Sequence, residues 1–122
     1  MKKVKTNIDL ILWQKSIEFV SSIYKVTAFF PTNETYAITT QIRRAVISIP
    51  SNIAEGAARH SRKEYIQFLY ITLGSIAELD TQLLISKNLS YISSDVYDKL
   101  CTALTELSKM TSSLIRNLST NP

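Results

Sequence analysis

The chain has 122 residues, 45% of them hydrophobic, with only two glycines, three prolines and one cysteine. A chain of this length is typical of one domain with a real hydrophobic core, and the composition excludes a disordered or low-complexity protein. Two glycines are too few for the many turns of an all-β fold, and the single Cys101 excludes a disulfide framework within the chain.

Charge is distributed unevenly along the chain. Residues 1–63 carry ten basic and four acidic side chains, a net charge of +6, whereas residues 64–122 carry four basic and six acidic ones, a net charge of −2. This asymmetry favours an anionic partner, with a merely solubilising charge as the alternative.

The sequence favours a soluble, cytoplasmic protein over a membrane protein. The longest uncharged run, residues 65–77, has 13 residues, whereas a membrane-spanning helix needs about 20. The N-terminus is basic, but Asp9 and Lys15 interrupt the apolar core that a secretory signal would need.

Apolar residues recur at helical spacing in four segments. The first predicted helix covers residues 9–29, and Pro31 stops it. The second covers residues 34–58, with Thr32 or Asn33 as its cap. Pro50 inside it predicts a kink. Gly56 either weakens its last turn or admits a neighbouring backbone.

The third predicted helix covers residues 62–87 and begins at Ser61-Arg-Lys-Glu64, which fits a capping box. The fourth covers residues 95–118, with Ser93 or Ser94 as its cap. Four amphipathic helices with short loops predict an all-α fold, an antiparallel up-and-down four-helix bundle, as a single domain over residues 1–122.

The second predicted helix carries two stripes at steps of three and four residues, which place each stripe on one face. The apolar stripe predicts a core-facing side: Ile38, Ile42, Ala45, Ile49 and Ile53. The polar stripe occupies a second face: Gln41, Arg44, Ser48, Asn52, Glu55 and Arg59.

Catalytic and metal-binding patterns are absent from the sequence, so we expect no enzyme activity, cofactor or metal. The one histidine, His60, lies among arginines in a predicted turn, and Cys101 has no base near it in sequence. No Glu-x-x-His pair and no glycine-rich phosphate loop occurs. We expect the aromatic residues at helical positions to pack in the core: Trp13, Phe19, Tyr24, Phe29, Tyr65, Phe68 and Tyr70.

Five cations lie between residues 41 and 63 against one acid, Glu55. They are the candidate nucleic-acid contacts, because arginine and lysine pair with phosphates: Arg43, Arg44, Arg59, Arg62 and Lys63. Arg43 and Arg59 are about 24 Å apart along a helix, at roughly 1.5 Å per residue, so one compact pocket cannot hold both. The alternative is a polar seam between subunits formed by Arg44, Asn52, Glu55 and Arg59.

Several motifs occur together over residues 8–118: Leu12-Trp-Gln-Lys15, Gln41-Ile-Arg-Arg-Ala45, Ser48-Ile-Pro-Ser-Asn-Ile-Ala-Glu-Gly56 and Gly74-Ser75 with Glu78-Leu79. In these the chain resembles the four-helix bundle family named for proteins encoded in 23S rRNA intervening sequences. That family is similar in fold to the accessory variability protein of diversity-generating retroelements. The resemblance implies a bacterial, ring-like homopentamer, with a role in assembly for Ser48, Asn52, Glu55 and Gly56. The retroelement relatives bind nucleic acid and reverse transcriptase.

We therefore expect a non-enzymatic, oligomeric bundle that binds RNA or DNA through its basic surface, with added charge from Lys2, Lys3 and Lys5. One alternative is a protein–protein assembly scaffold without nucleic-acid function. Another is an enzyme whose site is assembled across subunits.

Overall fold

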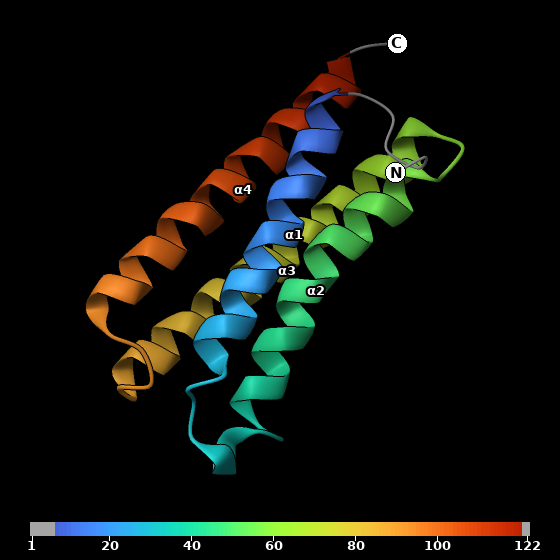
Figure 1. Ribbon diagram of the computed structural model, residues 1–122. Coiled ribbons are helices and arrows are strands. Elements are labelled where there is room, and N and C mark those ends of the chain that lie inside the picture. Colours follow the sequence, from blue (N-terminus) through green and yellow to red (C-terminus); the bar gives the residue numbers. More distant parts are fainter. Residues whose placement is uncertain (1–6, 121–122) are drawn as a thin grey trace.

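The computed structural model describes residues 7–120, which form four long helices and one short 3-10 helix (Figure 1). The helices are α1 (Asn7–Thr27), α2 (Ile38–Ala57), α3 (Arg62–Asn88) and α4 (Ser94–Thr120), and the 3-10 helix η1 covers Thr32–Glu34. Helix α2 packs against α1 and α3, and α4 packs against α3 and α1. These contacts confirm the predicted four-helix bundle. The lysines at positions 2, 3 and 5 lie outside the described residues.

The segment between α1 and α2 differs from the prediction. Helix α2 begins at Ile38 rather than at residue 34, and its N-cap is Ala37 without a side-chain hydrogen bond, so the predicted caps Thr32 and Asn33 are wrong. Tertiary contacts explain the difference, because they hold the preceding residues outside the helix. The Phe30 and Tyr91 rings lie 5.4 Å apart, and the Tyr91 hydroxyl donates to Glu34 at 2.5 Å.

The other helix starts follow the predicted capping residues. Ser61 is the N-cap of α3, and its hydroxyl accepts a hydrogen bond of 3.1 Å from the Glu64 amide. The Ser93 hydroxyl accepts one of 3.2 Å from the Val96 amide at the start of α4. Each bond satisfies a backbone donor that the first helical turn leaves without a partner.

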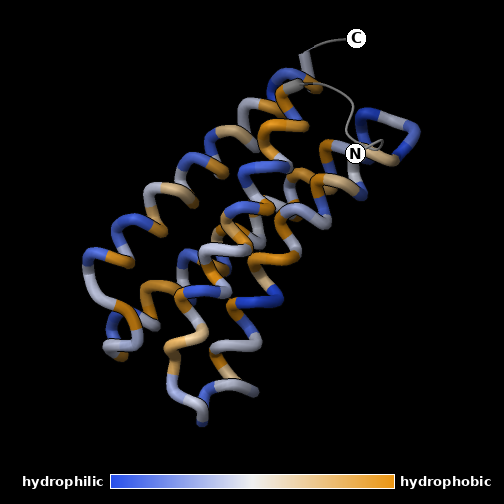
Figure 2. Tube along the Cα trace, viewed as in Figure 1, coloured by the Kyte–Doolittle hydropathy of each residue, from blue (hydrophilic) through white to orange (hydrophobic). Residues whose placement is uncertain are grey.

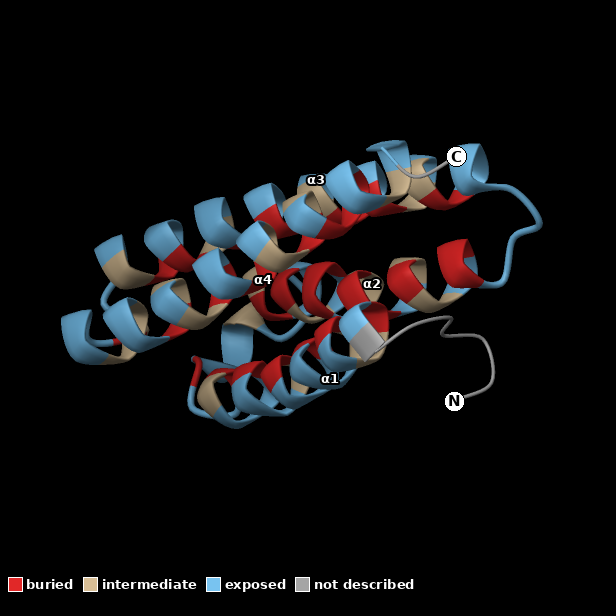
Figure 3. Ribbon diagram, turned by 90° about the horizontal axis from the view of Figure 1, so that it is seen from above, coloured by how far each residue is buried: buried red, intermediate tan, exposed pale blue. Residues whose placement is uncertain are grey.

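Hydrophobic residues recur along every helix (Figure 2), and the buried positions face the inside of the bundle (Figure 3). The predicted apolar stripe of α2 is buried from Ile42 to Ile53, with Ile38 half-buried. Helix α3 buries polar side chains that its apolar pattern did not indicate. Thr72 and Ser86 are fully buried and donate to the carbonyls of Phe68 and Gln82, which offsets the cost of removing a hydroxyl from water.

Helices α2 and α3 approach closely at Gly56. A Cβ atom at this glycine would lie 2.7 Å from Phe68 Cβ and 2.9 Å from Tyr65 Cδ1. Gly56 therefore admits the neighbouring helix, as one of its two predicted roles required. Helix α2 continues through Pro50, which is buried.

Helix α3 is apolar on its outer face as well as its inner one. Five large apolar side chains on it or at its end are exposed: Tyr70, Ile71, Leu84, Ile85 and Leu89. By length and composition alone, α3 could cross a membrane, with a mean hydropathy of 1.3 in its most apolar window. One such helix is weak evidence for a membrane span, because a helix of a soluble bundle can pass the same test.

Candidate nucleic-acid interface

The turn between α2 and α3 gathers cations at one end of the bundle. We call residues 59–63 the basic turn. Arg59, His60, Arg62 and Lys63 are all exposed there. Helix α1 begins and α4 ends at the same end (Figure 1), and a hydrogen bond of 2.7 Å from the Tyr65 hydroxyl to Asp9 Oδ2 joins the first turns of α3 and α1. The basic turn therefore projects from a rigid part of the fold.

Arg62 and Lys63 are both exposed and available to an external anion. They occupy the first turn of α3, and neither forms an ion pair within residues 7–120. The N-terminus of a helix carries a partial positive charge, so cations in its first turn are repelled rather than stabilised. Their charge adds to that of the helix end, and the local potential favours a bound anion.

Arg59 is positioned by two neighbours. Its Nη2 lies 3.2 Å from Glu55 Oε1, one helical turn earlier, and its guanidinium lies 4.8 Å from the centre of the Phe68 ring. Glu55, the one acid between residues 41 and 63, therefore pairs with Arg59. The Arg59 side chain remains 43% exposed, so one side of the guanidinium still faces solvent.

Arg43 and Arg44 lie near the opposite end of α2. Arg43 is half-buried and holds the end of α1: its Nε donates to Thr27 Oγ1 at 2.9 Å, and its guanidinium lies 4.3 Å from the centre of the Tyr24 ring. Arg44 is exposed and forms no ion pair within the described residues. The structure therefore divides the five predicted cations into two groups rather than bringing them together.

The resemblance implies a role in assembly for Ser48, Asn52, Glu55 and Gly56, but Ser48 and Gly56 contact α3 inside one chain. Ser48 Oγ lies 2.7 Å from Ser75 Oγ and 2.6 Å from the Ala45 carbonyl oxygen. Asn52 Nδ2 donates to the Ser48 carbonyl at 2.8 Å, and Gly56 is buried against α3. Of the four, Glu55 is the one exposed at the surface.

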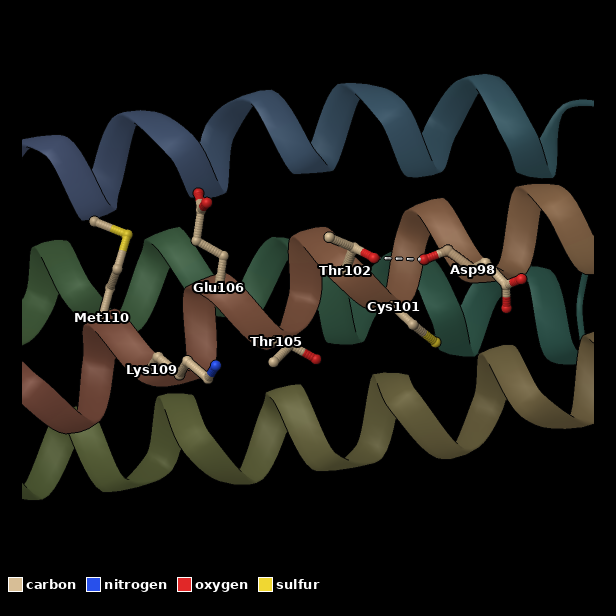
Figure 4. Close-up of a pocket in the computed structure, with 7 residues that line it drawn as sticks. All are labelled: Asp98, Cys101, Thr102, Thr105, Glu106, Lys109 and Met110. Carbon is tan, nitrogen blue, oxygen red and sulfur yellow. Dashed lines mark hydrogen bonds between the residues drawn. The ribbon is translucent and has the colours of Figure 1, made fainter.

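A shallow groove of about 650 Å³ runs along α4, and the seven side chains that line it all come from that helix (Figure 4). Cys101 and Thr105 point towards α3, whereas Glu106 points towards α1 and pairs with Lys15 at 3.0 Å. The lining thus spreads over the outer surface of one helix, and no cluster of three or more potential metal ligands occurs between residues 7 and 120.

Cys101 is the one cysteine of the chain, and it lies in this groove. Its thiol lies beside a carboxylate of α3, with Sγ 3.8 Å from Asp80 Oδ1. The hydrogen bond to Cys101, burial and the charges of Cys101, Asp80 and Asp98 raise the pKa of Tyr97 to about 12. His60 lies at the other end of the bundle, so the one histidine and the one cysteine of the chain are far apart.

Aromatic exposure is the feature that sequence reasoning missed. Phe19 and Tyr65 are buried, but Phe29 is 88% exposed, Tyr70 is 59% exposed and Tyr24 is 37% exposed, so the prediction of core packing is wrong for these three. Tyr36 is 97% exposed. Helix α1 ends at Thr27 rather than at residue 29 as predicted, so Phe29 lies outside the helical stripe that predicted its burial. The available signal was its position directly before Phe30-Pro31, because proline disfavours helical geometry in the residues before it.

Comparison with known proteins assigns the family. The 23S rRNA-intervening sequence protein family matches residues 8–113 of the chain. A solved structure of a protein of unknown function from the S23 ribosomal protein family of Bacteroides thetaiotaomicron is 28% identical and superposes with a TM-score of 0.83. The match covers 89% of this chain and 98% of that one. No protein with a curated description matches. The chain therefore belongs to the 23S rRNA-intervening sequence protein family.

Proposed function

We propose that this protein is a non-enzymatic, oligomeric helical bundle that acts in the cytoplasm and binds RNA or DNA through phosphate contacts at the basic turn. The observation that carries the proposal is the pair Arg62 and Lys63, exposed and without ion pairs among the described residues, beside the oriented guanidinium of Arg59. The family's name, which refers to ribosomal RNA, supports a nucleic-acid partner.

Phosphate contacts suit this surface better than base readout does. Arginine and lysine release condensed counterions when they neutralise phosphates, and the resulting affinity depends on salt but not on sequence. RNA and DNA share this backbone chemistry, so the proposal covers both polymers. Arg44, about 22 Å along α2 from Arg59 at roughly 1.5 Å per residue, would make separate contacts farther along the same strand.

The test replaces Arg62 and Lys63 with glutamine and measures the affinity for a ribosomal RNA fragment over a salt series. Loss of two phosphate contacts should flatten the slope of log affinity against log salt by about 1.5. Glutamine also relieves the repulsion at the start of α3, so the variant should fold normally.

The matched control is Lys99→Gln with Lys109→Gln. These two cations are exposed on α4, and the double change alters net charge by the same amount. An equal flattening in the control would show that net charge, not the basic turn, governs binding, and would contradict the proposed placement.

A second candidate function is protein–protein assembly, and the outer face of α3 favours it. Water-exposed Ile71 and Ile85 on this face are the kind of apolar surface that subunit contacts cover. Another apolar surface is a depression of about 300 Å³ between α1 and α2, which is lined by Trp13, Ile17, Val20, Ile47, Pro50, Ser51 and Ala54. We propose that copies of the chain associate through these surfaces, as the homopentamer implied by the family resemblance would require. Assembly and nucleic-acid binding are compatible.

A further inference from the structure

Two aromatic side chains in the segment between α1 and α2 point into solvent. We call residues 28–37 the α1–α2 tip. Phe29 is 88% exposed and Tyr36 is 97% exposed, more than any other large hydrophobic residue that the structure describes. Single exposed apolar residues are ordinary on a protein surface. Two aromatic side chains that are almost fully exposed within ten residues, however, call for an explanation.

The exposure of these rings does not arise from a lack of local structure. Successive backbone bonds hold the tip, including Phe29 N to Val26 O at 3.2 Å, Glu34 N to Pro31 O at 2.9 Å and Ala37 N to Glu34 O at 3.0 Å. Phe30 is buried against Tyr91, whose hydroxyl binds Glu34. The tip is therefore anchored to the loop between α3 and α4, while Phe29 and Tyr36 are directed away from the core.

Two exposed cations lie on the parts of α1 and α2 that lead to the tip. Lys25, in the last turn of α1, and Arg44, in the second turn of α2, are both exposed. Arg43 is already stacked on the Tyr24 ring one turn before the end of α1. The tip's own acid, Glu34, is half-buried and engaged by Tyr91. The tip thus presents flat apolar rings beside positive charge, at the end of the bundle opposite the basic turn (Figure 1).

We infer that the α1–α2 tip binds unpaired nucleotides, with bases stacked on Phe29 and Tyr36 and phosphates held by Lys25 and Arg44. Exposed rings interleaved with cations are the chemistry by which proteins bind single strands, because every base offers a flat face and every nucleotide a charge. Bases in a duplex are already stacked on one another, so the rings would favour a loop or a strand end. The inference rests on the proposed function and specifies its ligand as single-stranded RNA or DNA.

The test compares three oligonucleotides of one mixed sequence: single-stranded RNA, single-stranded DNA and the DNA duplex. Binding is measured for the wild type, for Phe29→Leu with Tyr36→Leu, and for Phe29→Trp with Tyr36→Trp. Leucine keeps apolar bulk but removes the flat ring, whereas tryptophan keeps a stacking surface. Tyr70→Leu, at an exposed aromatic residue on α3, is the matched control.

We expect the wild type to prefer a single strand over the duplex. The double leucine variant should lose about tenfold in single-strand affinity for each ring, with an unchanged salt slope because no charge is removed. The tryptophan variant and Tyr70→Leu should bind as the wild type does. The ratio of the affinities for single-stranded RNA and single-stranded DNA shows which polymer the tip prefers.

Two results overturn the inference and are distinguishable. If the wild type binds strand and duplex equally and the leucine variant is unaffected, the tip is not a nucleotide site, although the basic turn still binds phosphates. If the wild type binds none of the three at low salt, both the inference and the proposed function are wrong.

Discussion

At the scale of single residues, the two glycines of the chain have opposite surroundings. Alanine at Gly56 would place its Cβ 2.7 Å from Phe68 Cβ, which lies next to the backbone of α3 and cannot move aside, whereas no atom lies within 4 Å of a Cβ at Gly74. We predict that Gly56→Ala lowers the free energy of unfolding by about 1–3 kcal/mol through overpacking. Gly74→Ala should raise it by up to about 1 kcal/mol through helix propensity.

Chemical denaturation of both glycine variants and the wild type measures the difference. Equal stabilisation by the two alanines would mean that α2 and α3 do not approach closely at Gly56.

Tyr65 makes a buried polar contact between α3 and α1. Its hydroxyl donates to Asp9 Oδ2 at 2.7 Å, both side chains are 1% exposed, and burial raises the pKa of Tyr65 far above its ordinary value. A raised pKa in the folded state adds stability that is complete below the ordinary value of about 10 and is lost at higher pH. The wild type should therefore lose stability as the pH rises above about 10.

Tyr65→Phe tests this contact. The substitution removes one donor to a buried carboxylate and should cost about 1–3 kcal/mol at neutral pH. Its stability should also decline less steeply above pH 10. Tyr70→Phe, at an exposed position, should match the wild type in both measurements, and parallel alkaline declines for all three proteins would contradict the account.

At the scale of elements, helical periodicity predicts most of the fold. The predicted start of the third helix agrees with Arg62 and that of the fourth lies one residue after Ser94, because the capping serines act locally. The start of α2 could not be predicted in the same way. The segment before it is held by Tyr91, which lies more than 50 residues away in sequence.

The same distinction applies to the candidate site. The basic turn could be found from sequence because Arg59, Arg62 and Lys63 are neighbours along the chain. The contacts of Arg43 with Tyr24 and Thr27 depend on the packing of α1 against α2. The exposure of Phe29 and Tyr36 depends on the tertiary contacts of the tip, which bury Phe30 instead. Neither the Arg43 contacts nor this exposure produces a periodic pattern in the sequence.

The prediction about assembly concerns the outer face of helix α3. We expect Ile71→Lys with Ile85→Lys to reduce the molecular mass in solution towards that of a monomer, because both side chains lie on its outer apolar face and lysine there resists burial. Thr102→Lys with Ser113→Lys adds the same charge at exposed positions of α4 and should leave the mass unchanged.

Light scattering on the purified variants gives the mass directly. A wild type that is already monomeric, or a double isoleucine variant with the wild-type mass, would remove α3 from the assembly surface.

At the scale of the whole molecule, the two proposed binding surfaces lie at opposite ends of the bundle. The basic turn lies at one end, the aromatic α1–α2 tip lies at the other, and Arg44 lies between them on α2 (Figure 1). A helix the length of α2 spans about 30 Å. A nucleic-acid strand that follows α2 could therefore reach both ends of one subunit, and assembled subunits would multiply its contacts.

The measurement that tests phosphate binding most directly is the affinity of the wild-type protein for a structured ribosomal RNA fragment between about 50 and 200 mM salt. Three phosphate contacts at the basic turn predict that affinity falls about 20- to 40-fold over this range. No binding at the lowest salt, or an affinity that does not change with salt, would contradict the proposed function.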